Sequence, residues 1–457
     1  MSTIAAAPAP PRSPLDRFLG LFADVRPGEG LTAVLLMLNV CTLLCCYYII
    51  KPVREALILG GESAEVKSYA SAVMAVALIG LVPAYGKLAS RVDRMRLISV
   101  VSVIFVINLV MFYVLGRVGV PHLGIAFFIW VGIFNLMIIA QFWSFANDIY
   151  TQAEGERLFG IVAFGASLGA ILGGRVANVL FVKLGAYNLL LLAAGLLAAS
   201  LLLTAAVNRI ESNAQDAASR HAATAPLGRE GGFGLVISNR YLLYIALLAL
   251  VLNIVNTNGE YILGRTLSEA ADKMISQRPD LVASAAEFKR NFIGTYYAGF
   301  FTWVNTVGAV VQLFVVSRLV QRIGVRNALY VLPLIALGGY SLLAVAPVIA
   351  YIRAVKITEN SIDYSLQNTA RQALFLPTSR EAKYKAKSAI DTFFVRAGDV
   401  LSAGVVFAVS SLALTTRTVA LINLVLVVVW ILLVFAIGRR HQALTESPSA
   451  VGGAAQA

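Results

Sequence analysis

The sequence predicts an all-α polytopic membrane protein, with twelve transmembrane helices arranged in two six-helix bundles. Of its 457 residues, 59% are apolar and only 13% are charged, whereas soluble proteins average about 45–50% and about 25%. The apolar residues form long blocks, and a polar stretch near the middle of the chain divides these blocks six and six.

Each of the twelve apolar segments has roughly the 20 residues that a membrane-spanning helix needs. They cover 31–50, 67–89, 97–116, 122–147, 157–182, 187–208, 241–263, 292–317, 328–346, 347–370, 388–412 and 416–438. The expected parts are a tail (1–30), an N-terminal bundle (31–208), a linker (209–234), a C-terminal bundle (235–438) and a second tail (439–457). The linker is rich in Ala, Ser and Gly, which is typical of flexible connections. The first tail lacks the apolar core of a cleavable signal, so the first span is expected to stay in place.

A weak internal repeat favours a particular arrangement of the spans. The segment Leu88–Leu97 follows the second span and Leu319–Leu329 follows the eighth, with Arg91 and Arg322 at matched positions. Parallel six-helix repeats are the plan of major-facilitator transporters. The alternative is that both turns are only basic anchors at the inner face of the membrane.

The charge distribution predicts the orientation. With both termini in the cytoplasm, the inside segments hold about twice as many Lys and Arg residues as the outside loops, as the positive-inside rule requires. The net charge of +13 then reflects topology, and we expect no nucleic-acid partner.

The cysteines and histidines exclude several classes of protein. All three cysteines lie in the first span, and the three histidines are scattered over a loop, the linker and a tail, so no spacing suits a zinc site or a Cys/His pair. The sequence contains no Gly-rich loop of the kind that binds phosphate in nucleotide-hydrolysing motors. We expect no enzymatic activity, no metal and no cofactor, and a driving force that comes from a gradient or from exchange.

Charged residues enter the apolar segments near the end of the chain. In a helix, Lys383, Lys387 and Asp391 would share one face, with Arg396 and Asp399 one to two turns deeper. Burying charge in a membrane is costly, so such residues usually serve function. This cluster is interpreted as the entrance of an anion pathway.

The tenth span has a polar side along its whole length. Its polar residues recur at spacings of three and four: Arg353, Lys356, Asn360, Asp363, Gln367 and Arg371. This side either lines a water-filled cavity or forms buried ion pairs, and Glu359, three residues from Lys356, favours some internal pairing.

Two other spans carry polar groups. The seventh has Asn253, Asn256 and Glu260 on one face, and Glu260 is either an interfacial carboxylate or a gating or ion-coupling residue. Near the end of the first span, Tyr47, Lys51 and either Arg54 or Glu55 would share one face if the helix continues through Pro52; the proline could instead kink or end it. The fifth span has Gly165, Gly169 and Gly173, a pattern typical of close helix packing.

Three segments resemble the bacterial and plastidic ATP/ADP translocases. Lys51-Pro-Val-Arg54-Glu55 is similar to the element at the end of that family's first helix. Phe142–Asn147, with Glu154, Arg157 and the glycines from Gly165, resembles its fourth-to-fifth helix segment. Pro377–Asp391, with its lysines and Ala389-Ile390-Asp391, is the best match.

The resemblance implies a major-facilitator-like fold that exchanges nucleotides across a bacterial inner membrane. It implies that Lys51 or Arg54, and one of Lys383, Lys385 and Lys387, bind phosphate, and that Glu260 is the acid of the second half. The family's fourth-helix acid falls near Val131, and Trp130–Ile139 contains no acid, which leaves the nucleotide specificity open.

We therefore expect an alternating-access exchanger of nucleotides or related phosphorylated anions, acting as a monomer in the lipid bilayer. The candidate substrate-binding residues are Lys51, Arg54, Asn147, Arg353, Lys356, Lys383, Lys385, Lys387 and Arg396. The candidate gating or coupling residues are Glu55, Glu260, Asp363, Asp391 and Asp399. Aromatic residues in spans are more often packing residues or interfacial anchors, but some could stack a base. These candidates are Tyr47, Tyr48, Trp143, Tyr296, Tyr297 and Trp303.

Two alternatives remain open. A proton-coupled major-facilitator carrier of another organic anion would use Glu260, Asp363 or Asp391 as its titrating group. A membrane protein that senses a solute, or that moves lipid or envelope precursors, would show no exchange. Transport that needs a counter-solute distinguishes the exchanger from both.

The topology is testable with reporters. A reporter fused after Ala457 should be active in the cytoplasm, because the bias in Lys and Arg places the C-terminus inside. Activity of the same fusion in the periplasm would contradict both the orientation and the even number of spans.

Overall fold

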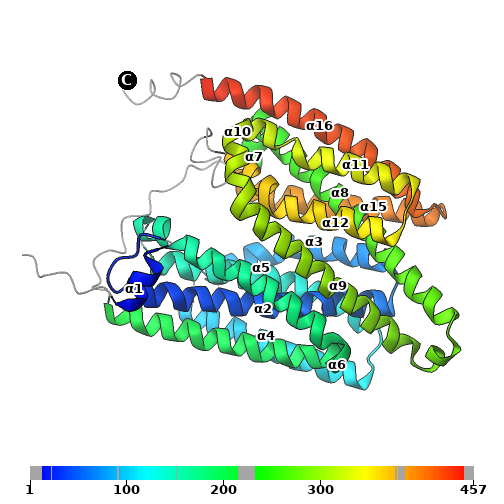
Figure 1. Ribbon diagram of the computed structural model, residues 1–457, viewed down its shortest axis with the longest axis horizontal. Helices are drawn as coiled ribbons and strands as arrows, with labels where there is room; N and C mark the ends of the chain where they lie inside the picture. The colour runs from blue at the N-terminus through cyan, green and yellow to red at the C-terminus, as the bar shows by residue number, and fades with distance from the viewer. Residues whose placement is uncertain are drawn as a thin grey trace, which may run out of the picture. The chain divides into compact units, whose positions relative to one another are not determined.

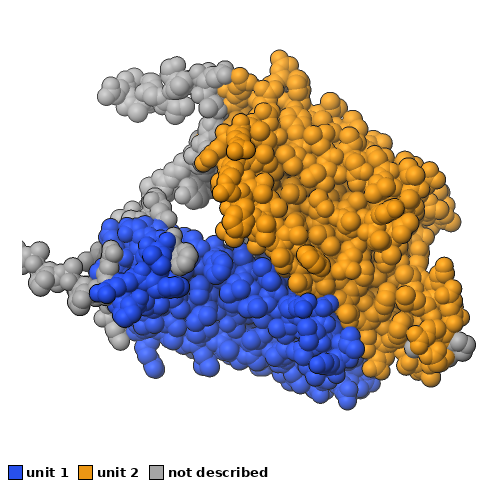
Figure 2. Space-filling model, viewed as in Figure 1, with its two compact units in different colours: residues 1–53, 86–121, 130–223 blue, residues 54–85, 122–129, 224–457 orange. Residues whose placement is uncertain are grey.

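The computed structural model describes residues 13–21, 23–89, 92–150, 152–214, 232–375, 378 and 386–446 (Figure 1). Two compact units are present (Figure 2): unit 1 contains residues 1–53, 86–121 and 130–223, and unit 2 contains 54–85, 122–129 and 224–457. The sequence predicts two bundles that are each continuous in the chain, residues 31–208 and 235–438. This division stays a prediction. Lys383, Lys385, Arg91 and most of the predicted linker lie outside the described residues.

Unit 1 is built from long helices. It holds α1 (Pro14–Leu19), the first part of α2 (Glu29–Gly61), α4 (Arg94–Val118), most of α5 (Leu123–Ile149) and α6 (Gln152–Ala214). The last of these breaks at Gly185, whose φ of 75° is readily adopted only by glycine. The break separates two membrane segments, as the predicted spans 157–182 and 187–208 require.

The predicted glycine contact joins the backbones of α2 and α6. A Cβ added at Gly165, Gly169 or Gly173 would lie 2.3, 2.2 or 2.4 Å from a carbonyl oxygen of α2. These oxygens belong to Met37, Cys41 and Cys45. The three glycines therefore allow a contact between two helices that no side chain could share, and their predicted packing role is confirmed.

The short helix α1 is tied to the start of α2 through Asp16. This buried carboxylate accepts hydrogen bonds from the backbone N–H groups of Ser13, Gly28 and Gly30, at 2.9, 3.2 and 3.0 Å. Hydrogen bonding to Ser13, Gly28 and Gly30 lowers the pKa of the Asp16 carboxyl below its usual value. Nearby, Arg157 of α6 holds Glu29 at 2.7 Å, so the beginnings of three helices are joined by polar contacts.

Unit 2 contains the end of α2, most of α3 (Ala64–Ala89), the start of α5 and the helices of the second half of the chain. These helices are α7 (Gly232–Ser238), α8 (Arg240–Ser276), α9 (Ala285–Val311), α10 (Ser317–Ala328), α11 (Val331–Val345), α12 (Ile349–Ile362), α13 (Asn368–Ala373), α14 (Lys387–Ala389), α15 (Val395–Ser411) and α16 (Thr416–Glu446). The long helix α8 lies at the centre and packs against α9, α12, α15 and α16 (Figure 1).

Three wide turns interrupt the helices of unit 2. The π-helical stretches Gln312–Val316, Asp363–Gln367 and Ile390–Phe394 connect α9 to α10, α12 to α13 and α14 to α15. Such turns are frequently found at functional sites. The second and third of them contain Asp363 and Asp391, two of the predicted gating or coupling residues.

The described residues contain nine helices that are long and apolar enough to cross a membrane. One of these, Arg157–Ile210, is divided at Gly185. The helix Val331–Val345 is apolar but shorter. The polar tenth segment corresponds to α12. Each of the twelve predicted spans therefore falls on a helical stretch of the described chain. The helix α2 continues through Pro52 to Gly61, so Lys51, Arg54 and Glu55 lie on one unbroken helix.

Replacing Gly169 by Leu should destabilise the protein, because its Cβ would meet the carbonyl oxygen of Cys41. Overpacking of this kind typically costs about 1–3 kcal/mol, which should appear as a lower midpoint of thermal unfolding in detergent. The matched control is Gly160→Leu, on the same helix, where an added Cβ meets nothing within 4 Å. Equal midpoints for the two variants would contradict the backbone contact.

Candidate functional site

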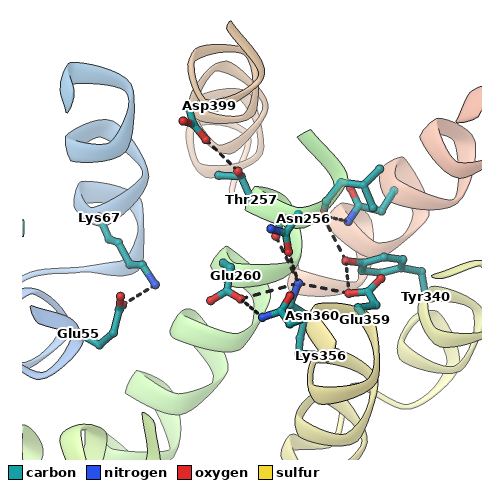
Figure 3. Close-up of polar contacts among 12 residues, drawn as sticks. Glu55, Lys67, Asn256, Thr257, Glu260, Tyr340, Lys356, Glu359, Asn360 and Asp399 are labelled. Carbon is teal, nitrogen blue, oxygen red and sulfur yellow. Dashed lines mark hydrogen bonds and ion pairs between the residues drawn. The ribbon is translucent and has the colours of Figure 1, made fainter. Parts of the chain in front are cut away.

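The centre of the candidate site is Lys356 of α12, whose side chain is completely buried. Its Nζ lies 2.8 Å from Asn256 Oδ1, 3.2 Å from Glu359 Oε2 and 3.8 Å from Glu260 Oε1 (Figure 3). A buried ammonium group is costly unless it is paired and hydrogen-bonded. Two acids and an amide from α8 and α12 meet that requirement here.

Further hydrogen bonds position the two acids. Tyr340 of α11 donates to Glu359 at 3.2 Å, and Asn360 donates to Glu260 at 3.2 Å (Figure 3). Room for this network comes from Gly259, where a Cβ would lie 2.3 Å from the Tyr340 hydroxyl and 2.9 Å from Lys356 Nζ. The absence of a side chain at this position lets α8 approach the lysine.

A small cavity of about 10 Å³ borders the network. Asn256, Glu359, Asn360 and Asp363 give it polar walls, and apolar residues with Trp430 complete the lining. A space of this size holds about one water molecule. Of the two predicted arrangements for the polar side of the tenth span, the structure contains the buried ion pair at Lys356. Asp363 borders a space for about one water molecule, and a water-filled path along this helix stays a prediction.

A second polar group links α15 to α8. The buried carboxylate of Asp399 accepts hydrogen bonds from Asn253 at 2.8 Å, Thr257 at 3.1 Å and Arg396 at 3.1 Å. Arg396 and Asp399, predicted for different roles, thus form an ion pair. Lys387 and Asp391 are half-buried at the start of the same helical segment.

A third group lies at the junction of α2 and α3. Glu55 is buried and accepts hydrogen bonds from Arg54 at 2.5 and 3.0 Å. Its other oxygen lies 2.6 Å from Lys67 Nζ (Figure 3). The Lys67 ammonium also lies over the ring of Tyr297, 5.3 Å from its centre. Lys67 is not among the site residues that the sequence predicts, although a lysine at the first position of an apolar span is a signal for it.

Polar contacts continue from α3 to the far part of α8. Tyr261 donates to Glu65 of α3 at 2.6 Å, and Arg265 donates to Tyr261 at 3.0 Å and to Glu269 at 2.9 Å. Together with the Glu55 group, these contacts fix the adjoining ends of α2 and α3 to the second half of the chain within unit 2.

The other predicted residues have different surroundings. Lys51 is buried in unit 1 with its Nζ over the rings of Tyr47 and Tyr48, at 5.8 and 5.3 Å, whereas Asn147 is exposed at the end of α5. The guanidinium of Arg353 lies over the ring of Tyr296, 5.0 Å from its centre. Val131 is completely buried, so the position that aligns with the family's fourth-helix acid is an apolar packing site.

Comparison with known proteins identifies the family. Residues 34–357 match the model of the Major Facilitator Superfamily. This chain belongs to that superfamily. The predicted fold class, an all-α polytopic membrane protein of the major-facilitator type, is confirmed.

Individual members of the superfamily are only distantly similar. ADP,ATP carrier protein 1 of Chlamydia pneumoniae is 22% identical over 347 residues, which cover 65% of this chain and 63% of the carrier. The chain thus matches less than two thirds of that relative's length. A variant of the nucleoside transporter NupG has a TM-score of 0.63 at 15% identity, covering 90% of this chain and 99% of its own. A bacterial homologue of ferroportin in an inward-facing state has a TM-score of 0.60 at 13% identity, covering 89% and 98%; these likenesses show the fold alone.

Replacing Lys356 by Gln should lower the yield and thermal midpoint of this superfamily member, because Glu359 would keep a buried charge without its ammonium partner. Breaking a buried pair in this way costs about 3–5 kcal/mol. The double variant Lys356→Gln with Glu359→Gln should recover part of the loss, since both charges are removed. The control is Ala354→Gln, at an exposed position on the same helix. A Lys356→Gln midpoint equal to that of the control would show that the pairing does not stabilise the fold.

Proposed function

We propose that the protein is an alternating-access exchanger of nucleotides or related phosphorylated anions. The observation that carries this proposal is that Arg54, Lys67 and Lys356 are held by carboxylates within helices of a membrane transporter. Arginine and lysine are the side chains that bind phosphate oxygens best in proteins. Cations kept inside the membrane at such cost are expected to serve an anionic substrate.

Aromatic rings accompany these cations and could bind the other part of a nucleotide. Tyr296 and Tyr297 follow one another on α9, with Arg353 over the first ring and Lys67 over the second. A flat base can stack on a tyrosine whose opposite face holds a cation. The similarity to a protein named as an ADP,ATP carrier supports a nucleotide, although at 22% identity.

The charged groups suggest how exchange could proceed. Without substrate, Glu55 would neutralise Arg54 and Lys67, and Glu260 would help to neutralise Lys356. A substrate phosphate would bring its own negative charge to these cations. The family resemblance implies that one of Lys383, Lys385 and Lys387 binds phosphate. The proposal also includes Lys51, Arg396 and the acids Asp391 and Asp399. We place both termini in the cytoplasm and the protein in a bacterial inner membrane.

A proton-coupled carrier is the second candidate, and the cavity beside α12 favours it. Glu359 and Asp363 are one helical turn apart and line the same small space with Asn256 and Asn360. Carboxylates that share a cavity are common proton carriers in transporters. Asp363 would then be the coupling residue.

Purified protein in liposomes decides between the two candidates. Vesicles loaded with ADP should take up labelled ATP or ADP, empty vesicles should not, and an uncoupler should leave the uptake unchanged. Uptake into empty vesicles that follows a proton gradient and is lost in Asp363→Asn would instead identify the proton-coupled carrier. A panel of labelled organic anions, offered to vesicles loaded with each anion in turn, tests the substrate class. Exchange of an unphosphorylated anion with none of the nucleotides would contradict the proposal.

A further inference from the structure

We propose that Glu55 is an internal anion that takes the place of a substrate phosphoryl group between Arg54 and Lys67, and that Lys67 is a substrate-binding residue. The inference rests on the proposed transport of phosphorylated anions. It assigns a role to Lys67 and makes Glu55 a competitor of the substrate.

The geometry around Glu55 is that of an anion site. One carboxylate oxygen receives two donors of the Arg54 guanidinium, at 2.5 and 3.0 Å, and the other lies 2.6 Å from the Lys67 ammonium. The cations come from two helices, α2 and α3, and each carboxylate oxygen lies beside one of them. A phosphoryl group offers the same kind of oxygens with more charge, and a guanidinium with an ammonium is a common pair of phosphate ligands.

Aromatic rings hold the two cations in position independently of the carboxylate. Lys67 Nζ lies 5.3 Å from the ring centre of Tyr297, and the Arg54 guanidinium lies 4.6 Å from that of Phe128. Cations at these distances are attracted to the ring faces. The site is therefore expected to keep its shape when Glu55 turns away, as a binding site for an exchangeable ligand must.

Burial explains why an internal anion is needed. Glu55 is only 1% exposed and Lys67 only 8%, so these groups are enclosed in the conformation described here. Two cations cannot be enclosed without a counter-charge. Glu55 supplies that charge in the empty protein, and a bound phosphoryl group would supply it in the loaded one.

Binding to single-residue variants tests the competition. The probes are ADP and inorganic pyrophosphate, with adenosine as the ligand that lacks phosphate, measured by calorimetry on purified protein. In Glu55→Gln the Kd for ADP and pyrophosphate should fall about tenfold, because the competitor is removed, and in Lys67→Gln it should rise about tenfold. Adenosine binding should not change. The control is Glu62→Gln, which removes the same charge just beyond the end of α2, where the partner is His122.

Two results would overturn the inference. One is a Glu55→Gln variant that binds ADP as weakly as Lys67→Gln, which would make Glu55 a structural support; the other is an unchanged Kd in both variants. If Glu55→Gln is not recovered in folded form, Glu55→Asp replaces it. Its shorter side chain draws the carboxylate away from Lys67, so the Kd for ADP should fall, and an equal or higher Kd would contradict the competition.

The same titrations separate this inference from the proposed function. Binding of ADP by the wild type with an unchanged Kd in both variants would keep the function and reject the role of Glu55. If the wild type binds no phosphorylated anion, sulfate and citrate are titrated instead. Tighter binding of either one in Glu55→Gln would keep the internal-anion role and reject the substrate class, and no change would reject both.

Discussion

A charged side chain enclosed among apolar helices must find a partner of opposite charge, and this requirement organises unit 2. Lys356 shows it most clearly, because its completely buried ammonium is surrounded by Asn256, Glu260 and Glu359. The long helix α8 supplies one side of this group and also the donors that reach Asp399. Its central position among the helices of unit 2 is thus accompanied by polar contacts as well as apolar packing.

Unit 1 is held together in a different way. Among its described residues, the buried polar side chains within the helices are largely neutral, for example Asn39, which donates to Thr204 at 2.7 Å. Close contact there relies on the backbones of α2 and α6 at the three glycines. Buried ion pairs are thus concentrated in unit 2, which also contains most of the proposed binding cations, while Lys51 belongs to unit 1.

The sequence predicted what depends on local spacing. Apolar blocks of sufficient length located the spans, and a separation of three residues indicated the pair Lys356–Glu359, which the structure contains. Contacts between distant segments could not be predicted in this way. The pairing of Glu55 with Lys67 depends on the turn between α2 and α3, and the bond from Tyr340 to Glu359 depends on how α11 packs against α12.

The family resemblance and the structure also contributed different information. The resemblance indicates Lys383 and Lys385, which lie outside the described residues. Lys67 pairs with Glu55 only through the three-dimensional arrangement of α2 and α3, which residue spacing does not predict. Residue composition did not predict the three π-helical turns. Such a turn only adds one residue to a turn of an otherwise ordinary α-helix, so the apolar pattern around it changes little.

Those wide turns have a mechanical consequence. An α-helix resists bending because each turn is tied to the next by regular hydrogen bonds, and a π-helical stretch interrupts that series. The segments from Ile349 to Ala373 and from Lys387 to Ser411 each contain one such weak point. Asp363 and Asp391 therefore lie at the positions where these two segments are expected to bend most readily, and a ligand bound at either acid would act on the direction of the helix that follows.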